Sequence, residues 1–179
     1  MPDYNLNNEF QKHLDAVGYG QRGNKFRITF PEFLEETRES DTSETVSYLV
    51  ESTSVPAKGI GTVKLNWMGV QASLPGDLQT SGTWNCTIKL DSENKAQRAF
   101  NTWLSSIFDS LSGTRGDLKE VFKKIKIELL DKNNAPASTY YLLNAFLTNL
   151  GDISVAMTSE NQITTWALTF AYADIAFDL

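Results

Sequence analysis

The chain has only one cysteine and one histidine among its 179 residues. Cys86 has no second cysteine to pair with, so no disulfide forms within the chain, which fits a reducing compartment or a protein that does not rely on disulfides. His13 has no cysteines or carboxylates near it at metal-ligand spacing. No GxSxG nucleophile motif and no complete phosphate-binding loop is present. We therefore expect no enzyme activity, no catalytic residue, no cofactor and no metal site.

Two further features are missing, and both concern partners. The net charge is −6 and the isoelectric point is about 4.8, whereas gripping nucleic acid through its phosphates requires clustered lysine and arginine. This charge does not argue against nucleic acid passing nearby without binding. No segment approaches the roughly 18 consecutive apolar residues of a membrane helix, and the N-terminus has no apolar signal core. We expect a soluble subunit without a membrane segment, made inside a cell.

What is present indicates one globular domain. Apolar residues make up 41% of the chain and charged residues 21%, which are ordinary values for a protein with a core. No internal repeat or linker divides the sequence. We expect a single domain over residues 1–179, in which residues 1–24 form an N-terminal arm. That arm contains a predicted short helix at residues 6–17, which is a candidate for docking on a neighbouring chain.

Alternation of polar and apolar residues predicts about seven or eight strands. The predicted strands are residues 25–30, 45–53, 62–67, 83–90, 123–129, 138–148, 153–157 and 162–173. Residues 138–148 are apolar on both faces, which predicts burial on both sides or contact with another chain. The expected fold class is mainly β with one long α-helix, arranged as an antiparallel β-sandwich or barrel with the helix packed on it.

The hydrophobic period changes to that of a helix after residue 90. Large apolar residues recur at three- and four-residue steps between residues 96 and 111. Asp91 and Ser92 offer an N-cap, and Glu93 would lie in the first turn. These features predict an amphipathic helix from about Ser92 to Leu111 that lies across a sheet.

The last predicted strand has two unlike faces. One face carries Trp166, Leu168, Phe170 and Tyr172. The opposite face carries Thr165, Ala167, Thr169, Ala171 and Ala173, and the preceding strand has a similar small face of Ser154, Ala156 and Thr158. A smooth face of small residues suits a strand that lies against another backbone or lines a passage. This pattern indicates assembly and not catalysis.

Three other segments are candidates for contacts with partners. Residues 55–78 form a predicted extended arm that starts with VPAKGIG and ends at PGD. Residues 32–44 contain five Glu, one Asp and one Arg and are expected to form a polar loop. A basic patch could meet an acidic surface on a partner, or it could be a solvated strand face. It consists of Lys119, Lys123, Lys124 and Lys126.

The order of these motifs resembles a known family. A strand with an aromatic residue is followed by VPAKGIG, an arm to PGD, a Trp-bearing strand and a helix that opens with DSEN. The chain then closes with DISVAMTSENQITTWALTFAYADIAF. Over roughly residues 20 to 178, this arrangement is similar to the tail tube protein of contractile-tailed bacteriophages, whose members resemble the tube subunits of type VI secretion systems and pyocins.

The resemblance implies an assembly and a set of partners. Six subunits would form a ring in which strands from all six complete an inner β-barrel, and rings would stack into a tube inside a contractile sheath. The implied partners are other copies of the chain, the tail sheath protein, and the baseplate and tail terminator proteins. DNA would pass through the channel without specific binding. The protein would belong to the virion and assemble in the cytoplasm of the bacterial host.

The resemblance also implies roles for particular residues. Channel-lining residues would be Asp152, Ser154, Ala156, Thr158, Glu160, Thr165, Ala167, Thr169 and Ala171. Asp152 and Glu160 would repel phosphates at the edge of this wall, or they are simply solvated turn residues. Ring-stacking residues would be Val55, Lys58, Trp67, Met68, Val70, Leu74 and Asp77.

Other interpretations remain open at this point. A baseplate tube-initiator ring or a type VI secretion or pyocin-like tube would share the fold. A lipocalin-like small-molecule carrier belongs to a different class. It would have a closed eight-stranded barrel with a helix near its end, whereas the long predicted helix here lies in the middle of the chain.

The predicted arm leads to a first test. Trp67→Ala, or deletion of residues 69–76, should leave a folded subunit that no longer polymerises, because the arm would contact other copies and not the core of its own chain. Electron microscopy of the purified variants measures this outcome. Normal tubes from the deletion variant would contradict it.

Overall fold

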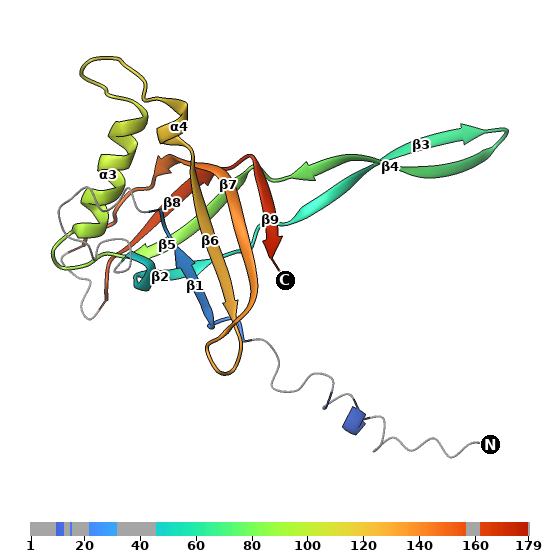
Figure 1. Cartoon of the computed structure of the whole chain (residues 1–179), viewed down its shortest axis with the longest axis horizontal. Helices are drawn as coiled ribbons and strands as arrows, with labels where there is room; N and C mark the ends of the chain where they lie inside the picture. The colour runs from blue at the N-terminus through green and yellow to red at the C-terminus, as the bar shows by residue number, and fades with distance from the viewer. Residues whose placement is uncertain (1–9, 13–14, 16–21, 32–45, 157–161, 179) are drawn as a thin grey trace.

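The computed structural model describes residues 10–12, 15, 22–31, 46–156 and 162–178. Within these ranges the protein is mainly β, and every strand pair is antiparallel (Figure 1). The strands are β1 (Phe26–Thr29), β2 (Val50–Thr53), β3 (Lys58–Trp67), β4 (Val70–Thr80), β5 (Thr83–Lys89), β6 (Lys123–Leu130), β7 (Pro136–Leu150), β8 (Thr165–Ala171) and β9 (Asp174–Asp178). The helices in this part are α3 (Lys95–Ile107) and α4 (Leu118–Val121).

Seven strands form one folded sheet and two form a separate hairpin. The sheet has the order β1-β6-β7-β8-β5-β2, with β9 paired to β7, and β3 pairs only with β4. The predicted mainly β, antiparallel fold is therefore confirmed. Among the described strands the sheet does not close into a barrel, because β1 and β2 at its two ends pair with no further strand.

The long strand β7 is shared by both halves of the sheet. Its first part pairs with β6 and β9, and its last part, from Phe146, pairs with β8. Between these parts Asn144 has a φ of 52°, in the left-handed region that asparagine tolerates better than most residues. The inward-facing positions change there from Leu142 to Ala145 and Leu147, all buried. This phase change explains much of the two-sided apolar pattern predicted for residues 138–148.

The interior between the two halves of the sheet is filled by aromatic side chains. Phe170 of β8 lies 5.2 Å from Trp84 of β5 and 5.5 Å from Trp103 of α3, measured between ring centroids. Phe100 of α3 packs edge-on against Phe30 at 5.4 Å. Such aromatic contacts add about 0.5–1.5 kcal/mol each beyond the burial of their area. Helix α3 is thus held against the sheet by its aromatic face, as its periodicity predicts.

Helix α3 is shorter than predicted. It spans 13 residues, Lys95–Ile107, and not Ser92 to Leu111. Asp91 still serves the N-terminus, because its carboxylate accepts bonds from the backbone N–H groups of Lys95 and Ala96 at 2.9 and 3.3 Å. Glu93 lies before the helix and pairs with the Lys95 side chain at 2.9 Å, so its predicted place in the first turn is wrong. At the other end the backbone of Phe108 is extended, and Leu111 is fully exposed.

Three predicted strands differ from the structure. Residues 46–48 form a helical turn, so the strand predicted at 45–53 is limited to β2. Residues 151–156 have no regular structure where a strand was predicted at 153–157. The last predicted strand, at 162–173, is limited to β8, and after a bend at residues 172–173 the chain forms a further strand, β9. Residues 118–121 form the short helix α4. The loop predicted at 32–44 and most of the helix predicted at 6–17 lie outside the described residues. Of the predicted helix, residues 10–12 and 15 are described, and they are helical.

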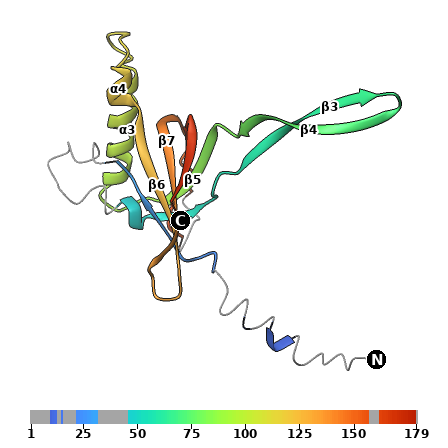
Figure 2. The ribbon, with the colours of Figure 1, turned by 45° about the vertical axis from the view of Figure 1, so that its right-hand side comes forward.

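The predicted single extended arm is a β-hairpin. Strands β3 and β4 project outward from the sheet, on the side opposite to α3 (Figures 1 and 2). The two residues between them, Met68 and Gly69, have φ values of 43° and 81°. Positive φ at both positions is the geometry of a tight two-residue hairpin turn. The arm therefore reverses direction at Met68-Gly69 and does not end at the PGD sequence.

The base of the hairpin is tied to β9 by an ion pair. Lys58 Nζ lies 2.7 Å from the Asp174 carboxylate and 5.7 Å from the centre of the Phe177 ring. The hydrogen bond from Lys58, together with the backbone N–H of Ile175, lowers the pKa of Asp174 below its ordinary value. The hairpin thus starts from a fixed point on the sheet.

The left-handed conformation of Asn144 leads to a stability prediction. Asn144→Val should lower the free energy of unfolding by about 1–2 kcal/mol, because a branched side chain is strained at positive φ, whereas Asn144→Gly should change it by less than about 1 kcal/mol. Asn149→Val, at an exposed position of β7 with ordinary φ, serves as the control. Urea denaturation measures all three variants. Equal stability of the Val and Gly variants at position 144 would show that this conformation is unimportant.

The ion pair at the hairpin base leads to a pH prediction. A carboxyl group whose folded pKa is depressed stabilises the fold above its unfolded pKa, and this contribution is lost as the pH falls through the folded pKa. Lys58→Met removes the hydrogen bond from Lys58, so it should raise the pKa of Asp174 toward its ordinary value. The smaller effect of the Ile175 N–H remains. NMR titration of the Asp174 carboxyl group measures the change, with Lys64→Met as the control. An unchanged pKa in Lys58→Met would contradict this assignment.

Candidate functional site: three assembly surfaces

The outer face of β5 and β8 is built from small and polar side chains. In the register of the two strands, Thr83 lies opposite Ala171, Asn85 opposite Thr169, Thr87 opposite Ala167 and Lys89 opposite Thr165. We call these eight residues the small-residue face. The opposite face of the same strands is fully used by the core, since Trp84, Cys86, Ile88, Trp166, Leu168 and Phe170 are all buried. Because the large side chains of β5 and β8 point inward, the small-residue face is smooth.

The segment that follows β7 extends this face. Gly151 donates its N–H to the carbonyl of Ala167 at 2.8 Å, and its own carbonyl accepts the indole N–H of Trp166 at 2.7 Å. A Cβ atom at residue 151 would come within 2.9 Å of the Ala167 carbonyl oxygen, so only glycine allows this approach. The segment is thereby held beside β8.

Most of the predicted channel residues lie together as a result. Asp152, Ser154 and Ala156 line a shallow cavity of about 570 Å³ with Thr165 and Ala167. Thr169 and Ala171 continue the same face along β8. Thr158 and Glu160 lie outside the described residues.

Sequence reasoning did not assign the outer residues of β5 to this surface. Their alternation is visible in the sequence, but the pairing of β5 with β8 is what places Thr83, Asn85 and Thr87 beside the predicted residues. The only charged side chain on the small-residue face is Lys89, whose Nζ lies 3.8 Å from Glu51 of β2. The face therefore carries little net positive charge.

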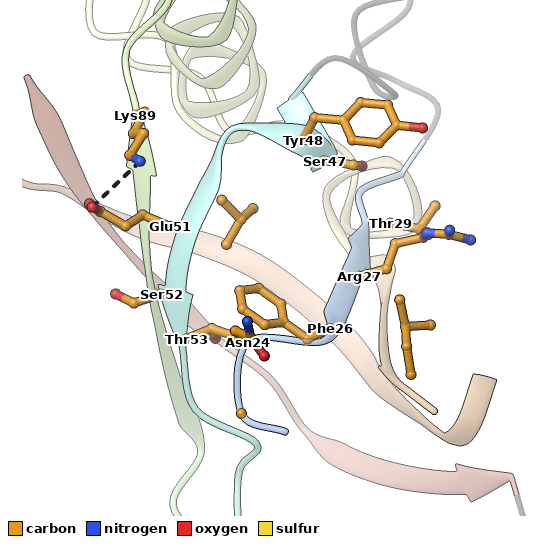
Figure 3. A pocket seen from close by; sticks show the side chains of 13 residues that line it. Asn24, Phe26, Arg27, Thr29, Ser47, Tyr48, Glu51, Ser52, Thr53 and Lys89 are labelled. Carbon is orange, nitrogen blue, oxygen red and sulfur yellow. Dashed lines mark ion pairs between the residues drawn. The ribbon is translucent and has the colours of Figure 1, made fainter. Parts of the chain in front are cut away.

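The second surface is the gap between the two ends of the sheet. A cavity of about 900 Å³ lies between β1 and β2 (Figure 3). Phe26, Val50 and Leu130 give it an apolar lining, and Arg27 and Glu51 are exposed among its lining residues. The backbone edges of β1 and β2 next to this gap have no strand partner among the described residues.

The half of the sheet that contains β2 has a second free edge at its other end, on strand β7. β6 pairs with β7 only as far as Ala145, whereas β8 pairs with β7 from Phe146 to Leu150. Residues 146–150 therefore have a strand partner on one side only within the described chain. The four strands β2, β5, β8 and β7 form a half-sheet with an unpaired edge at each end.

The third surface is one face of the hairpin. The pairs Val63–Leu74, Leu65–Ala72 and Trp67–Val70 place six apolar residues on the same side, and Lys64, Asn66, Gln71 and Ser73 lie on the other side. Trp67 is 72% exposed and Val70 is 68% exposed. We call these six residues the ribbon face. All six side chains are exposed within the described part of the chain, and β3 and β4 pair only with each other.

The structure brings together four of the seven predicted stacking residues. Trp67, Val70 and Leu74 lie on the ribbon face, and Met68 is in the turn beside them with 88% of its surface exposed. Val55 packs against the core and Lys58 pairs with Asp174, so both belong to the base of the hairpin. Asp77 is exposed near the base, where Gly61 and Gly76 approach each other closely.

The described residues contain no cluster of ligands that could hold a metal ion, and no helix among them could cross a membrane. His13 lies outside them. Cys86 is buried between the sheet halves, and desolvation raises its pKa, so the thiol is not reactive. In the basic patch, Lys124 lies 3.7 Å from the centre of the Tyr141 ring and Lys126 lies 2.6 Å from Glu128. Part of that patch is therefore occupied by contacts within the chain.

Comparisons with known proteins agree with this picture. The sequence profile described as "Phage tail tube protein" matches residues 21–177. The tail tube protein of Serratia phage KSP90 is 26% identical over 174 residues, covering 96% of each chain.

Two solved structures show the same fold. The tube-terminating cap of the anti-feeding prophage gives a TM-score of 0.64 at 18% identity, covering 91% of this chain and 93% of that one. A chain of the sheath–tube complex of an extracellular contractile injection system gives 0.62 at 18% identity, covering 93% and 96%. From the profile that spans residues 21–177, we conclude that the chain belongs to the phage tail tube protein family.

Proposed function

We propose that this protein is the structural subunit of the tail tube of a contractile phage, with the whole chain acting as one tail-tube domain. Six copies form a ring, rings stack into a tube, and the channel conducts viral DNA into the host cell. The tube belongs to the virion, assembles in the host cytoplasm, and has the sheath, baseplate and terminator proteins as partners. The observation that carries this proposal is the half-sheet with two unpaired edges and a small-residue face.

The strand order of the half-sheet suits a closed ring. Its four strands alternate in direction, so β2 at one edge runs opposite to β7 at the other. When copies are related by rotation, β2 of one subunit meets β7 of the next in antiparallel orientation. An even number of strands therefore continues the ladder around the ring without a break. Closure pairs the edge N–H and C=O groups that would otherwise favour uncontrolled association.

The cavity between β1 and β2 provides the space for this pairing. A strand added to β2 would lie along its free edge, beside Val50 and Phe26. Burying these half-exposed apolar side chains would add about 25 cal/mol per Å² of apolar surface to the backbone hydrogen bonds. The small-residue face would then line the channel.

The chemistry of that face fits transport of DNA without specific binding. Strong binding to phosphates needs several lysine or arginine contacts, and the small-residue face offers only Lys89, which is near Glu51. Asp152 is exposed at the edge of the face and adds negative charge. Contacts with DNA would be few and weak, so the molecule could slide.

Stacking of rings follows from the hairpin. An isolated two-stranded ribbon is marginally stable in water, and this one exposes six apolar residues on one side. A contact with another ring would cover that side. The proposed stacking residues are Trp67, Met68, Val70 and Leu74, with Val55, Lys58 and Asp77 at or near the base.

The alternatives differ in how well the structure supports them. A tube-initiator ring or a type VI secretion-like tube would use the same edges and face, so these remain variants of the proposal. A lipocalin-like carrier requires an internal ligand cavity. Here Trp84, Phe100, Trp103 and Phe170 fill the space between the sheet halves, which does not favour a carrier.

Disulfide trapping tests the ring. Cysteines replacing Thr53 on β2 and Thr148 on β7 should form disulfides between neighbouring copies under mild oxidation, and Ser52 with Asn149 provides a second pair in the same antiparallel register, at exposed positions of both strands. We expect a ladder of covalent species that ends at six chains on a denaturing gel. Central channels should be visible by electron microscopy. The buried Cys86 leaves the engineered thiols as the reactive ones.

The control places the second cysteine at Leu111, which is 98% exposed in the loop that follows α3. This pair should give no ladder. If neither edge pair forms covalent oligomers, or if the protein stays monomeric at high concentration, the proposed ring is wrong.

A further inference from the structure

We propose that the ribbon face of one copy docks into an apolar cleft at the opposite end of a second copy, in the next ring of the tube. This inference rests on the proposed stacking and names the surface that receives the hairpin. We call the receiving surface the far-end cleft, and define it by Leu90, Ile153, Val155 and Ile163, with Asp91 and Asn94 at its rim.

The far-end cleft is a second apolar surface left open by the chain. It has a volume of about 680 Å³. Val155 is 83% exposed and Ile163 is 63% exposed, whereas Leu90 and Ile153 pack partly against the core. Exposed apolar residues that gather around a hollow, instead of being scattered, are characteristic of an interaction site.

The cleft and the hairpin lie at opposite ends of the same strand. The hairpin joins β5 at its start, since β4 ends at Thr80 and β5 begins at Thr83. The cleft begins at Leu90, directly after β5 ends at Lys89. In Figures 1 and 2 the hairpin projects away from the end of the sheet where β5 leads into α3. Copies stacked end to end would therefore bring a hairpin of one toward the cleft of another.

This arrangement gives a head-to-tail contact. Its two halves are different surfaces, so each copy offers one hairpin and one cleft and the contact repeats without limit along an axis. A self-complementary contact between two hairpins would instead stop after two rings. A tube of many rings therefore requires a separate receiving surface, and the far-end cleft fits that requirement.

The two surfaces match in chemistry. Trp67 at the end of the ribbon face supplies a large apolar side chain of the kind that anchors protein interfaces, and such residues bury about 150–250 Å² each. Lys64, the only charged residue from Thr62 to Leu74, lies on the other side of the hairpin, so the ribbon face itself carries no charge. The cleft has Asp91 at its rim, and Asp152 lines an adjoining cavity that shares Val155 and Ile163 with it. An uncharged ribbon face would therefore meet the apolar centre of the cleft, with the carboxylates left at its rim.

A mixing experiment tests the docking. One variant removes the hairpin contact with Trp67→Ser and Val70→Ser, and the other removes the cleft contact with Val155→Ser and Ile163→Ser. All four side chains are more than half exposed, so both variants should fold. Leu118→Ser, which changes an equally exposed leucine elsewhere, is the matched control and should form long tubes. Electron microscopy measures the number of stacked rings.

Each double variant alone should form single rings and no tubes. A mixture of the two should form double rings and nothing longer, because only the intact hairpin of one ring and the intact cleft of the other can meet. Long tubes from the cleft variant would overturn the inference while leaving the proposed tube intact. Absence of rings from the unchanged protein would overturn both.

A covalent test gives independent evidence. A chain with Met68→Cys is mixed with a chain with Val155→Cys and assembled under mild oxidation. We expect disulfide-linked pairs that contain one chain of each kind, and none when Leu118→Cys replaces Val155→Cys. Equal cross-linking to both positions, or none to Val155→Cys in assembled tubes, would show that the hairpin docks elsewhere.

Discussion

The fold depends on one strand being shared by two halves of a sheet. Strand β7 changes phase at Asn144, and this lets its first part face β6 and β9 while its last part faces β8. The sheet folds over at that point, with Leu142 on one side of the change and Leu147 on the other both reaching the same interior. Without the phase change, one of the two would point to solvent. The aromatic packing around Phe170 and Phe100 follows from this fold.

The large apolar side chains of the sheet fill the interior of the subunit. Contacts between copies must therefore use the other surfaces of the chain. Backbone edges are left at β2 and β7, small residues on the outside of β5 and β8, and apolar residues on a hairpin that has no partner among the described residues of its own chain. Each of these three surfaces suits a contact in a different direction. Edges suit neighbours around a ring, the smooth face suits a channel, and the hairpin suits neighbours along an axis. None of these surfaces requires a titratable or nucleophilic group, in keeping with a structural family.

The sequence predicted the parts of this fold that depend on local pattern. The alternation in residues 165–172 and the helical period around Phe100 both correspond to elements of the structure. It failed where tertiary context decides. The two-sided pattern of β7 hides a change of phase at one asparagine, and the reversal at Met68-Gly69 lacks the usual Asn-Gly or Asp-Gly signal. The outer face of β5 could not be joined to that of β8 because strand pairing is a long-range property that one sequence does not display.

The placement of Cys86 has a consequence for the life of the assembled particle. The only thiol of the chain is closed between the sheet halves with its pKa raised by burial, so little thiolate forms to react with oxygen or peroxide. In the proposed tail tube, assembly in the host cytoplasm would be followed by exposure to an oxidising medium. A tube of many such subunits would expose no cysteine sulfur to the medium. Its contacts between subunits would therefore not be altered by the change from reducing to oxidising surroundings.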